Sequence, residues 1–209
     1  MLSIEVPQCR VFKVVLCGEY GVGKSSLFRR FVYDTFVDTS DRYSSVGFDN
    51  FEKRYTFNDK EVVLQLWDTG GLERIATVTS GYFKFAHGAI LVFSFDDFSS
   101  FNVLPQHLLD IVTSAEKARI YLCGNKQDLA NRSTRPTEED IALFYEENQI
   151  SGEQVFANTF KVSCKTNQGV HLLFESIARD LASHFIAPPD QTIFMLKPRT
   201  DNKSCCSKS

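Results

Sequence analysis

The chain has 209 residues, of which 43% are hydrophobic and 13% aromatic, so it is long enough to bury the core of one domain. Its 23 basic and 26 acidic side chains give a formal net charge of -3, which provides no long-range positive field and disfavours nucleic-acid binding. No apolar run approaches the roughly 18 to 20 residues that a membrane-spanning helix needs, and residues 1–10 lack the apolar run of a signal peptide, so a cytoplasmic protein is expected.

Strand-like apolar runs alternate with helical patterns through most of the chain. The runs expected to form strands cover residues 11–17, 48–57, 61–68, 89–95, 120–123 and 160–162. The patterns expected to form helices cover residues 24–33, 101–113, 137–148 and 169–185. This alternation predicts an α/β fold in which helices cover both faces of a mostly parallel sheet. A hairpin-like turn at Asn58-Asp59-Lys60 predicts one antiparallel edge strand.

The helical pattern stops shortly before Pro188-Pro189, which breaks any helix. The residues that follow have no periodic apolar pattern and are expected to form a mobile tail. The predicted organisation is therefore a short N-terminal extension over residues 1–9, one folded domain over residues 10–186 and a flexible tail over residues 187–209.

The first motif lies directly after the first expected strand, where Gly18-Glu19-Tyr20-Gly21-Val22-Gly23-Lys24-Ser25 matches the phosphate-binding P-loop pattern. Glycines let backbone N–H groups converge on phosphate oxygens at the start of a helix. In such a loop Lys24 contacts the β- and γ-phosphates and Ser25 binds Mg²⁺, so both are candidate catalytic residues. The loop residues predicted to bind nucleotide are Gly18, Glu19, Tyr20, Gly21, Val22, Gly23, Lys24, Ser25 and Ser26.

A second motif, Trp67-Asp68-Thr69-Gly70-Gly71, ends the third expected strand. Asp68 could hold Mg²⁺ through a water molecule, and the Gly71 N–H could sense a γ-phosphate. These positions are those expected of a protein that distinguishes a nucleoside triphosphate from a diphosphate.

Two further motifs indicate which base is bound. Asn125-Lys126-Gln127-Asp128 follows a buried strand, at the end where open parallel sheets bind their ligands. The Asp128 carboxylate can accept hydrogen bonds from guanine N1–H and the 2-amino group, whereas adenine would leave it buried and unpaired. Ser163-Cys164-Lys165 could supply a backbone N–H to the guanine carbonyl oxygen. The set predicts GTP and GDP binding and disfavours an unrelated P-loop kinase or ATPase.

The four motifs, in this order and each at a strand end, resemble the Ras superfamily of small GTPases. Residues 64–69, Glu73-Arg74 and residues 79–83 further resemble the Rab signature around the second switch, and looser similarity covers residues 10–185. The resemblance implies a P-loop NTPase fold with a six-stranded sheet and five helices. It also implies Mg²⁺-dependent binding of GTP and GDP, and effectors that read two switch segments.

By position, the resemblance places Phe36 against the guanine and Ser45 where a first-switch threonine binds Mg²⁺. The segment between them is longer than expected for Rab chains, so Ser44 is an alternative ligand. Leu72 stands where the family has the glutamine that orients the attacking water, and the leucine side chain cannot form a hydrogen bond. Tyr20 stands where a small residue is usual and could obstruct an arginine finger. Both departures predict slow hydrolysis, unless another residue or a partner positions the water.

Cysteines occur in two settings. Cys9, Cys17, Cys123 and Cys164 have no zinc-ligand spacing and are expected to be small buried hydrophobes. Cys205 and Cys206, near the end, resemble the Rab ending that carries two geranylgeranyl groups, and two lipid chains give stable membrane anchoring. The last four residues also fit a CaaX box formally, although Ser207 and Lys208 are not aliphatic.

Two functions are compatible with these features: a lipidated Rab-like GTPase that switches membrane trafficking, and a constitutively GTP-loaded scaffold with negligible hydrolysis. For the first, the resemblance implies a guanine-nucleotide exchange factor, a GTPase-activating protein, a GDP-dissociation inhibitor, escort proteins and switch-reading effectors as partners. It places the protein in the cytoplasm and, after lipidation, on the cytoplasmic face of an intracellular membrane.

Overall fold

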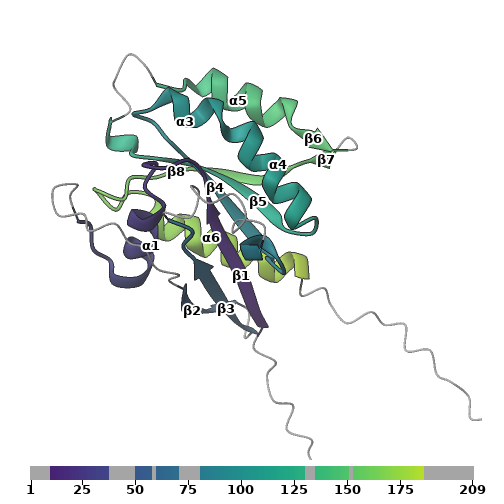
Figure 1. The fold of residues 1–209 in the computed structure, drawn as a ribbon. Helices are drawn as coiled ribbons and strands as arrows, with labels where there is room; N and C mark the ends of the chain where they lie inside the picture. Colours follow the sequence, from purple (N-terminus) through teal and green to yellow (C-terminus); the bar gives the residue numbers. More distant parts are fainter. Residues whose placement is uncertain are drawn as a thin grey trace, which may run out of the picture.

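The computed structural model of the chain describes residues 10–37, 50–57, 60–70, 81–129, 135–150 and 153–185. Six strands form one sheet in the order β2-β3-β1-β4-β5-β8 (Figure 1). Their bounds are β1 Arg10–Cys17, β2 Asn50–Phe57, β3 Lys60–Trp67, β4 Gly88–Ser94, β5 Arg119–Asn125 and β8 Phe156–Lys161. Strand β2 pairs antiparallel with β3, and every other pairing is parallel. The predicted sheet, with its antiparallel edge strand, is confirmed.

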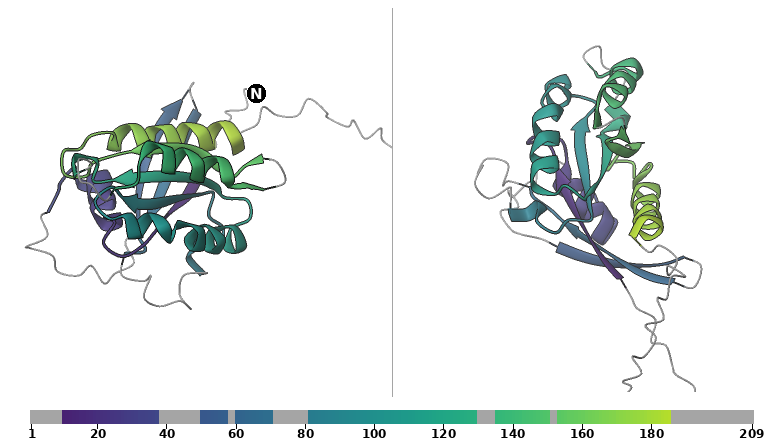
Figure 2. Two further views of the ribbon diagram at one scale, coloured as in Figure 1. Left: turned by 90° about the horizontal axis from the view of Figure 1, so that it is seen from above. Right: turned by 90° about the vertical axis from the view of Figure 1, so that its right-hand side faces the viewer.

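Helices cover both faces of this sheet (Figure 2). They are α1 Lys24–Tyr33, α3 Phe98–Asn102, α4 Leu104–Ser114, α5 Glu138–Glu147 and α6 Val170–Phe185, with a 3-10 turn at Gln127–Leu129. Helices α1 and α6 pack on one face, and α3, α4 and α5 pack on the other. Among the described helices, none is both long and apolar enough to cross a bilayer.

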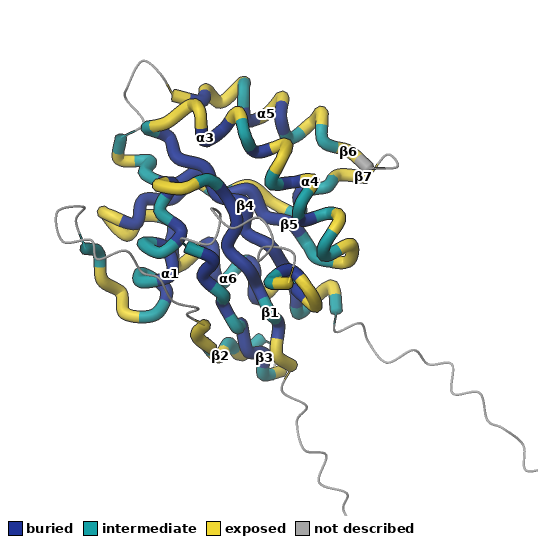
Figure 3. The backbone as a smooth tube through the Cα atoms, viewed as in Figure 1, coloured by how far each residue is buried: buried dark blue, intermediate teal, exposed yellow. Residues whose placement is uncertain are grey.

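The two cores follow from the alternation of side chains along each strand. In β1, Phe12, Val14 and Leu16 contribute to the core under α1 and α6, whereas Val15 and Cys17 contribute to the opposite one. All seven residues of β4 are buried, because this central strand is covered on both faces, as the dark blue tube in Figure 3 shows. The parallel strands therefore form a rigid frame, and the loops at their carboxyl ends meet along one edge.

One predicted helix is wrong. The sequence predicted a single helix over residues 101–113, but the structure has α3 and α4, divided at Val103. Pro105 stands in the first turn of α4 and has no N–H with which to continue the bonding of a preceding helix. The helix expected over residues 137–148 is confirmed as α5, with Thr137 and Asp140 forming a capping box.

The last strand also differs from expectation. Residues 160–162 were predicted to be extended, whereas β8 begins at Phe156 and ends at Lys161. Its exposed polar residues, among them Asn158 and Thr159, give it no continuous apolar pattern. The sequence also gave no indication of the small hairpin of β6 Gln149–Ile150 and β7 Glu153–Gln154.

Helix α6 is held in place near its carboxyl end. Near its carboxyl end, Asp180 accepts hydrogen bonds from the Arg119 guanidinium at 2.5 and 3.0 Å and from the Tyr121 hydroxyl at 2.6 Å. The Arg10 guanidinium donates to the carbonyl oxygen of Phe185 at 2.7 Å. These contacts hold the end of α6 beside the start of β1 and β5, away from the edge where the parallel strands end (Figure 1).

Candidate functional site

The loop after β1 approaches the neighbouring strands too closely for side chains at two glycines. Gly18 has a φ of 134°, and a Cβ there would lie 2.1 Å from the carbonyl oxygen of Val92. Gly23 has a φ of 100°, and a Cβ there would lie 2.3 Å from Nδ2 of Asn125. Both values lie in the left-handed region, which glycine adopts without strain. The P-loop is therefore packed against the ends of β4 and β5, and α1 begins at its last residues.

The Lys24 side chain lies inside this loop. Its ammonium donates to the carbonyl oxygens of Gly18 and Glu19 at 2.8 and 2.9 Å, and the residue is 4% exposed. The Glu19 carboxylate accepts the Tyr20 N–H at 2.8 Å and lies 3.7 Å from Nε2 of His107 in α4. Burial is the main cause of a lowered pKa at His107, which the Glu19 carboxylate opposes. Tyr20 in the same loop is 59% exposed.

The residues after β3 lie beside the start of α1. The Thr69 hydroxyl donates to the carbonyl oxygen of Leu16 at 2.7 Å, and the Gly70 N–H donates to Asp68 at 2.9 Å. A Cβ on Gly70 would lie 2.2 Å from the Ser25 hydroxyl oxygen and 3.2 Å from both carboxylate oxygens of Asp68. The hydroxyl and the carboxylate thus face one point, and oxygen ligands of this kind suit Mg²⁺.

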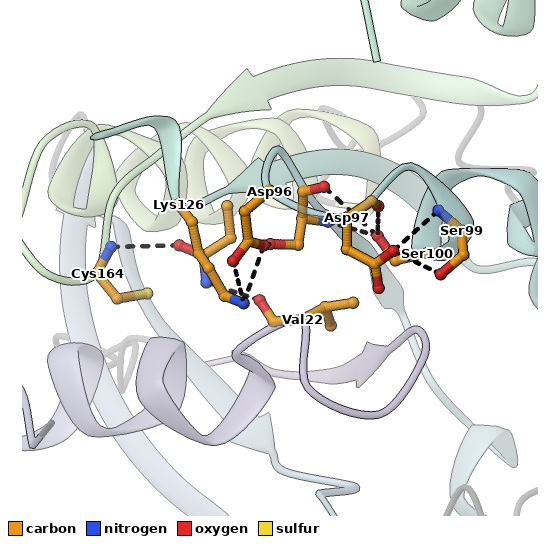
Figure 4. A network of polar contacts seen from close by, with 9 residues as sticks. Val22, Asp96, Asp97, Ser99, Ser100, Lys126 and Cys164 are labelled. Carbon is orange, nitrogen blue, oxygen red and sulfur yellow. Dashed lines mark hydrogen bonds and ion pairs between the residues drawn. The ribbon is translucent and has the colours of Figure 1, made fainter. Parts of the chain in front are cut away.

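Asn125, at the end of β5, connects two of the other loops and is 1% exposed. Its Nδ2 donates to the carbonyl oxygen of Val22 at 2.9 Å, and its Oδ1 accepts the Cys164 N–H at 3.2 Å. Figure 4 shows Cys164 at one end of the drawn network and Val22 near the Lys126 side chain. The Asn125 side chain holds the P-loop and the loop after β8 at a fixed separation.

Asp128 is oriented from the loop after β8. The Ser163 hydroxyl donates to the Asp128 carboxylate at 2.5 Å, and the same hydroxyl oxygen accepts the Thr166 N–H at 3.1 Å. Burial raises the pKa of the neighbouring Cys164 thiol to about 12, so this thiol is protonated and packs as a small hydrophobe.

A cavity of about 240 Å³ lies where these loops meet. It is lined by Gly23, Ser26, Phe36, Asp96, Asn125, Lys126, Asp128, Leu129, Cys164 and Lys165. The structure therefore brings together the predicted base-binding residues of two separate motifs and Phe36, and it places them directly beside the P-loop. A planar, polar ligand attached to phosphates fits this arrangement, in which a cavity lined by polar and apolar residues lies next to the glycine-rich P-loop.

Comparisons with known proteins agree with this geometry. The sequence pattern of the Ras family matches residues 13–183. The chain belongs to the Ras family. The rice Ras-related protein RIC1 is 32% identical over 205 residues, 94% of this chain and 96% of its own length. The Ras-related protein RABE1e of Arabidopsis thaliana is 35% identical over 173 residues, covering 82% of this chain and 75% of its own. Human Ras-related protein Rab-25 is 35% identical over 172 residues, with coverage of 82% and 76%.

The chain is thus a small GTPase that resembles the Rab proteins, with the P-loop GTPase fold. Members of the Ras family hydrolyse GTP, bind GTP and GDP, and work with regulators and effectors. Seven residues with predicted roles in this GTPase lie outside the described residues: Cys9, Ser44, Ser45, Gly71, Leu72, Cys205 and Cys206. Their predicted roles stay predictions.

Sequence reasoning missed two residues that line the cavity of this GTPase, Asp96 and Leu129. Leu129 belongs to the turn that carries Asp128 and gives no chemical signal of its own. Asp96 did give a chemical signal, because an acidic residue two positions beyond a fully buried parallel strand lies at the edge where such sheets bind ligands.

Proposed function

We propose that this small GTPase is a Rab-like switch of membrane trafficking, which binds GTP and GDP with Mg²⁺ and hydrolyses GTP slowly. The observation that carries the nucleotide assignment is the shared cavity, in which Asp128, Asn125 and Lys126 lie beside the P-loop residue Gly23. The proposed working unit is the domain of residues 10–186, followed by a tail of residues 187–209 that carries the lipid site.

Guanine selectivity is assigned to Asp128, whose carboxylate is held by the Ser163 hydroxyl at 2.5 Å. A fixed carboxylate matches guanine N1–H and the 2-amino group, and an adenine base would leave it without partners. Asp128→Asn should weaken GTP binding severely and shift selectivity toward xanthine nucleotides, because the new amide can donate to the xanthine carbonyl. Competition between GTP, ATP and xanthosine triphosphate measures this. Unchanged GTP affinity in the variant would contradict the assignment.

Mg²⁺ is assigned to the point that the Ser25 hydroxyl and the Asp68 carboxylate face. Asp68 would hold the ion through a water molecule, and Ser45 of the first switch, or Ser44 in its place, would be a further ligand. When bound, the ion neutralises charge on the phosphates. The chain itself orients the Asp68 carboxylate through the Gly70 N–H and positions Ser25 at the start of α1. Ser25→Asn should therefore bias binding toward GDP, and equal affinities for GTP and GDP in this variant would argue against the role.

Slow hydrolysis is inferred from Leu72, because a leucine cannot orient the attacking water. Tyr20 supports the inference, because its side chain in the P-loop is exposed and would obstruct an arginine finger there. In single-turnover assays the wild-type rate should fall below the order of 10⁻⁴ s⁻¹ at which Ras hydrolyses GTP without an activating protein. Leu72→Gln should raise it, and adding Tyr20→Ser should restore acceleration by an activating protein.

The same assay separates the two candidate functions. A measurable rate that rises with Leu72→Gln supports a slow switch, whereas no turnover, alone or with cell extract, supports the constitutively GTP-loaded scaffold, which Leu72 and Tyr20 also favour. Wild-type hydrolysis as fast as that of Leu72→Gln would overturn slow hydrolysis altogether.

Membrane attachment is assigned to Cys205 and Cys206 together, because one lipid chain gives only marginal binding. The proposed location is the cytoplasm and the cytoplasmic face of an intracellular membrane, with escort proteins and a GDP-dissociation inhibitor handling the lipids. An exchange factor, an activating protein and switch-reading effectors complete the proposed partners. Replacing both cysteines by serine should abolish pelleting with membranes in cells, each single change should reduce it, and Cys9→Ser should leave it intact. A double variant that still pellets would show another anchor.

A further inference from the structure

The turn after β4 brings a carboxylate to the base cavity. Asp96 lies 3.0 and 3.2 Å, through its two oxygens, from the ammonium of Lys126, and its side chain is 19% exposed (Figure 4). It also accepts a hydrogen bond from the hydroxyl of Ser94, which is fully buried. Both members of the ion pair line the cavity assigned to guanine.

This ion pair is built into the fold. The Asp96 oxygen nearer to Lys126 also accepts the Ser94 hydroxyl, and additional hydrogen bonds of this kind help to offset the desolvation cost of an ion pair that is partly out of water. Burial acts to raise the pKa of Asp96, but hydrogen bonds from Ser94 and Lys126 outweigh it, and the net pKa is lowered. The carboxylate is therefore ionised at neutral pH.

The segment that carries Asp96 is itself held in place. The Ser94 N–H donates to the Ser100 hydroxyl oxygen at 3.0 Å, and that hydroxyl donates to the carbonyl oxygen of Asp97 at 2.6 Å. Asp97 caps α3 by accepting the Ser99 N–H at 3.0 Å. Asp96 thus projects from a turn fastened to both β4 and α3, and it can hold its partner in one position.

The Lys126 side chain needs the support of a fixed carboxylate. Lys126 has a φ of 61°, in the left-handed region that side chains rarely adopt, so its backbone is strained. Its long side chain has many rotamers, and its ammonium would otherwise be free to sample them. Two charged oxygens at hydrogen-bond distance restrict it to the wall of the cavity.

We propose that Asp96 is a positioning residue for guanine-nucleotide binding, which fixes the Lys126 ammonium so that the Lys126 side chain forms one wall of the base cavity. The inference rests on the proposed guanine site and extends it from the four sequence motifs to a fifth segment, the turn between β4 and α3. Removing the carboxylate frees the Lys126 side chain, and the nucleotide then leaves faster.

The test is the rate of dissociation of a fluorescent GDP, measured on the full chain with Mg²⁺ and excess unlabelled GDP. Asp96→Ala should accelerate release about tenfold, the value expected from losing one charged hydrogen-bonded contact. Asp96→Asn keeps an oxygen acceptor for Lys126 and should give an intermediate rate. Asp97→Asn is the matched control, because it removes the same charge from the adjacent exposed residue and keeps a good helix cap, so its rate should equal that of the wild type.

A double-mutant cycle separates positioning from a general loss of stability. Lys126→Met keeps most of the side-chain length and removes the ammonium, so adding Asp96→Ala in that background should change the rate little. Additive effects would overturn the inference, as would wild-type release from Asp96→Ala. If Asp96→Ala does not fold by circular dichroism, Asp96→Asn takes its place in the same cycle. A wild-type chain that does not bind GDP would overturn the guanine site as well, whereas selective GDP binding with unchanged release from the variants would overturn this inference only.

Discussion

Asn125→Ala should weaken both the fold and nucleotide binding, because one side chain joins two loops of the site. The change removes the donor to the carbonyl oxygen of Val22 at 2.9 Å and the acceptor of the Cys164 N–H at 3.2 Å, and both contacts are buried. A buried polar group left without a partner costs about 1–3 kcal/mol, so two cost about 2–6 kcal/mol. Domains of this kind are stable by about 5–15 kcal/mol, which makes the expected loss a large fraction of the total.

Urea unfolding at a series of GDP concentrations measures the two effects separately. The unfolding free energy extrapolated to zero GDP reports the fold, and its rise with the logarithm of GDP concentration reports the affinity. Asn158→Ala is the matched control, because Asn158 is exposed and its side-chain oxygen accepts the N–H of the adjacent Thr159, and it should stay within about 0.5 kcal/mol of the wild type. An Asn125→Ala protein equal to this control in both quantities would refute the reasoning.

Three other results are expected. Gly23→Ala should abolish GDP binding, because its Cβ would meet Nδ2 of Asn125 at 2.3 Å. A Cβ at Gly21 would have open space within 4 Å, so Gly21→Ala should lower the unfolding free energy only by the strain of its φ of 84°, about 1 kcal/mol. Burial and Lys13 lower the pKa of His87, whose Nδ1 accepts the Lys13 N–H at 3.1 Å. The stability that neutral His87 contributes to the fold is therefore complete above the unfolded pKa of about 6.5 and is lost as the pH falls below it. Melting temperatures from pH 8 to 5 should therefore fall less steeply in His87→Gln than in the wild type. Chelating Mg²⁺ with EDTA should accelerate GDP release, and an unchanged rate would argue against a metal at the phosphates.

The motif residues were predictable because each is a local signal at the end of a strand. The spacing of Gly18, Gly23 and Lys24 specifies a loop, and the apolar run before it specifies the strand that positions the loop. Parallel pairing then brings the strand ends to one edge, so the residues after β5 and β8 could be placed beside the P-loop without any knowledge of side-chain contacts.

The pair of Asp96 and Lys126 could not be predicted in that way, because it depends on register between distant segments. Ser94 in β4 stands opposite Asn125 in β5, and this pairing places the residues that follow the two strands side by side. No local pattern contains that register. The division at Val103 was missed for a related reason, since Pro105 is compatible with the first turn of a helix and only its hydrogen bonding reveals where the helix starts.

The fastening of α6 has a mechanical consequence. The helix has 16 residues and is therefore about 24 Å long, and it begins near the loop after β8 and ends where Arg10 and Arg119 hold it. A pull applied to the chain beyond Phe185 is transmitted to the starts of β1 and β5, which are the strands whose far ends carry the P-loop and Asn125. A domain held through this end of α6 would have the cavity assigned to the nucleotide at its opposite end, where the cavity is accessible to partners in solution.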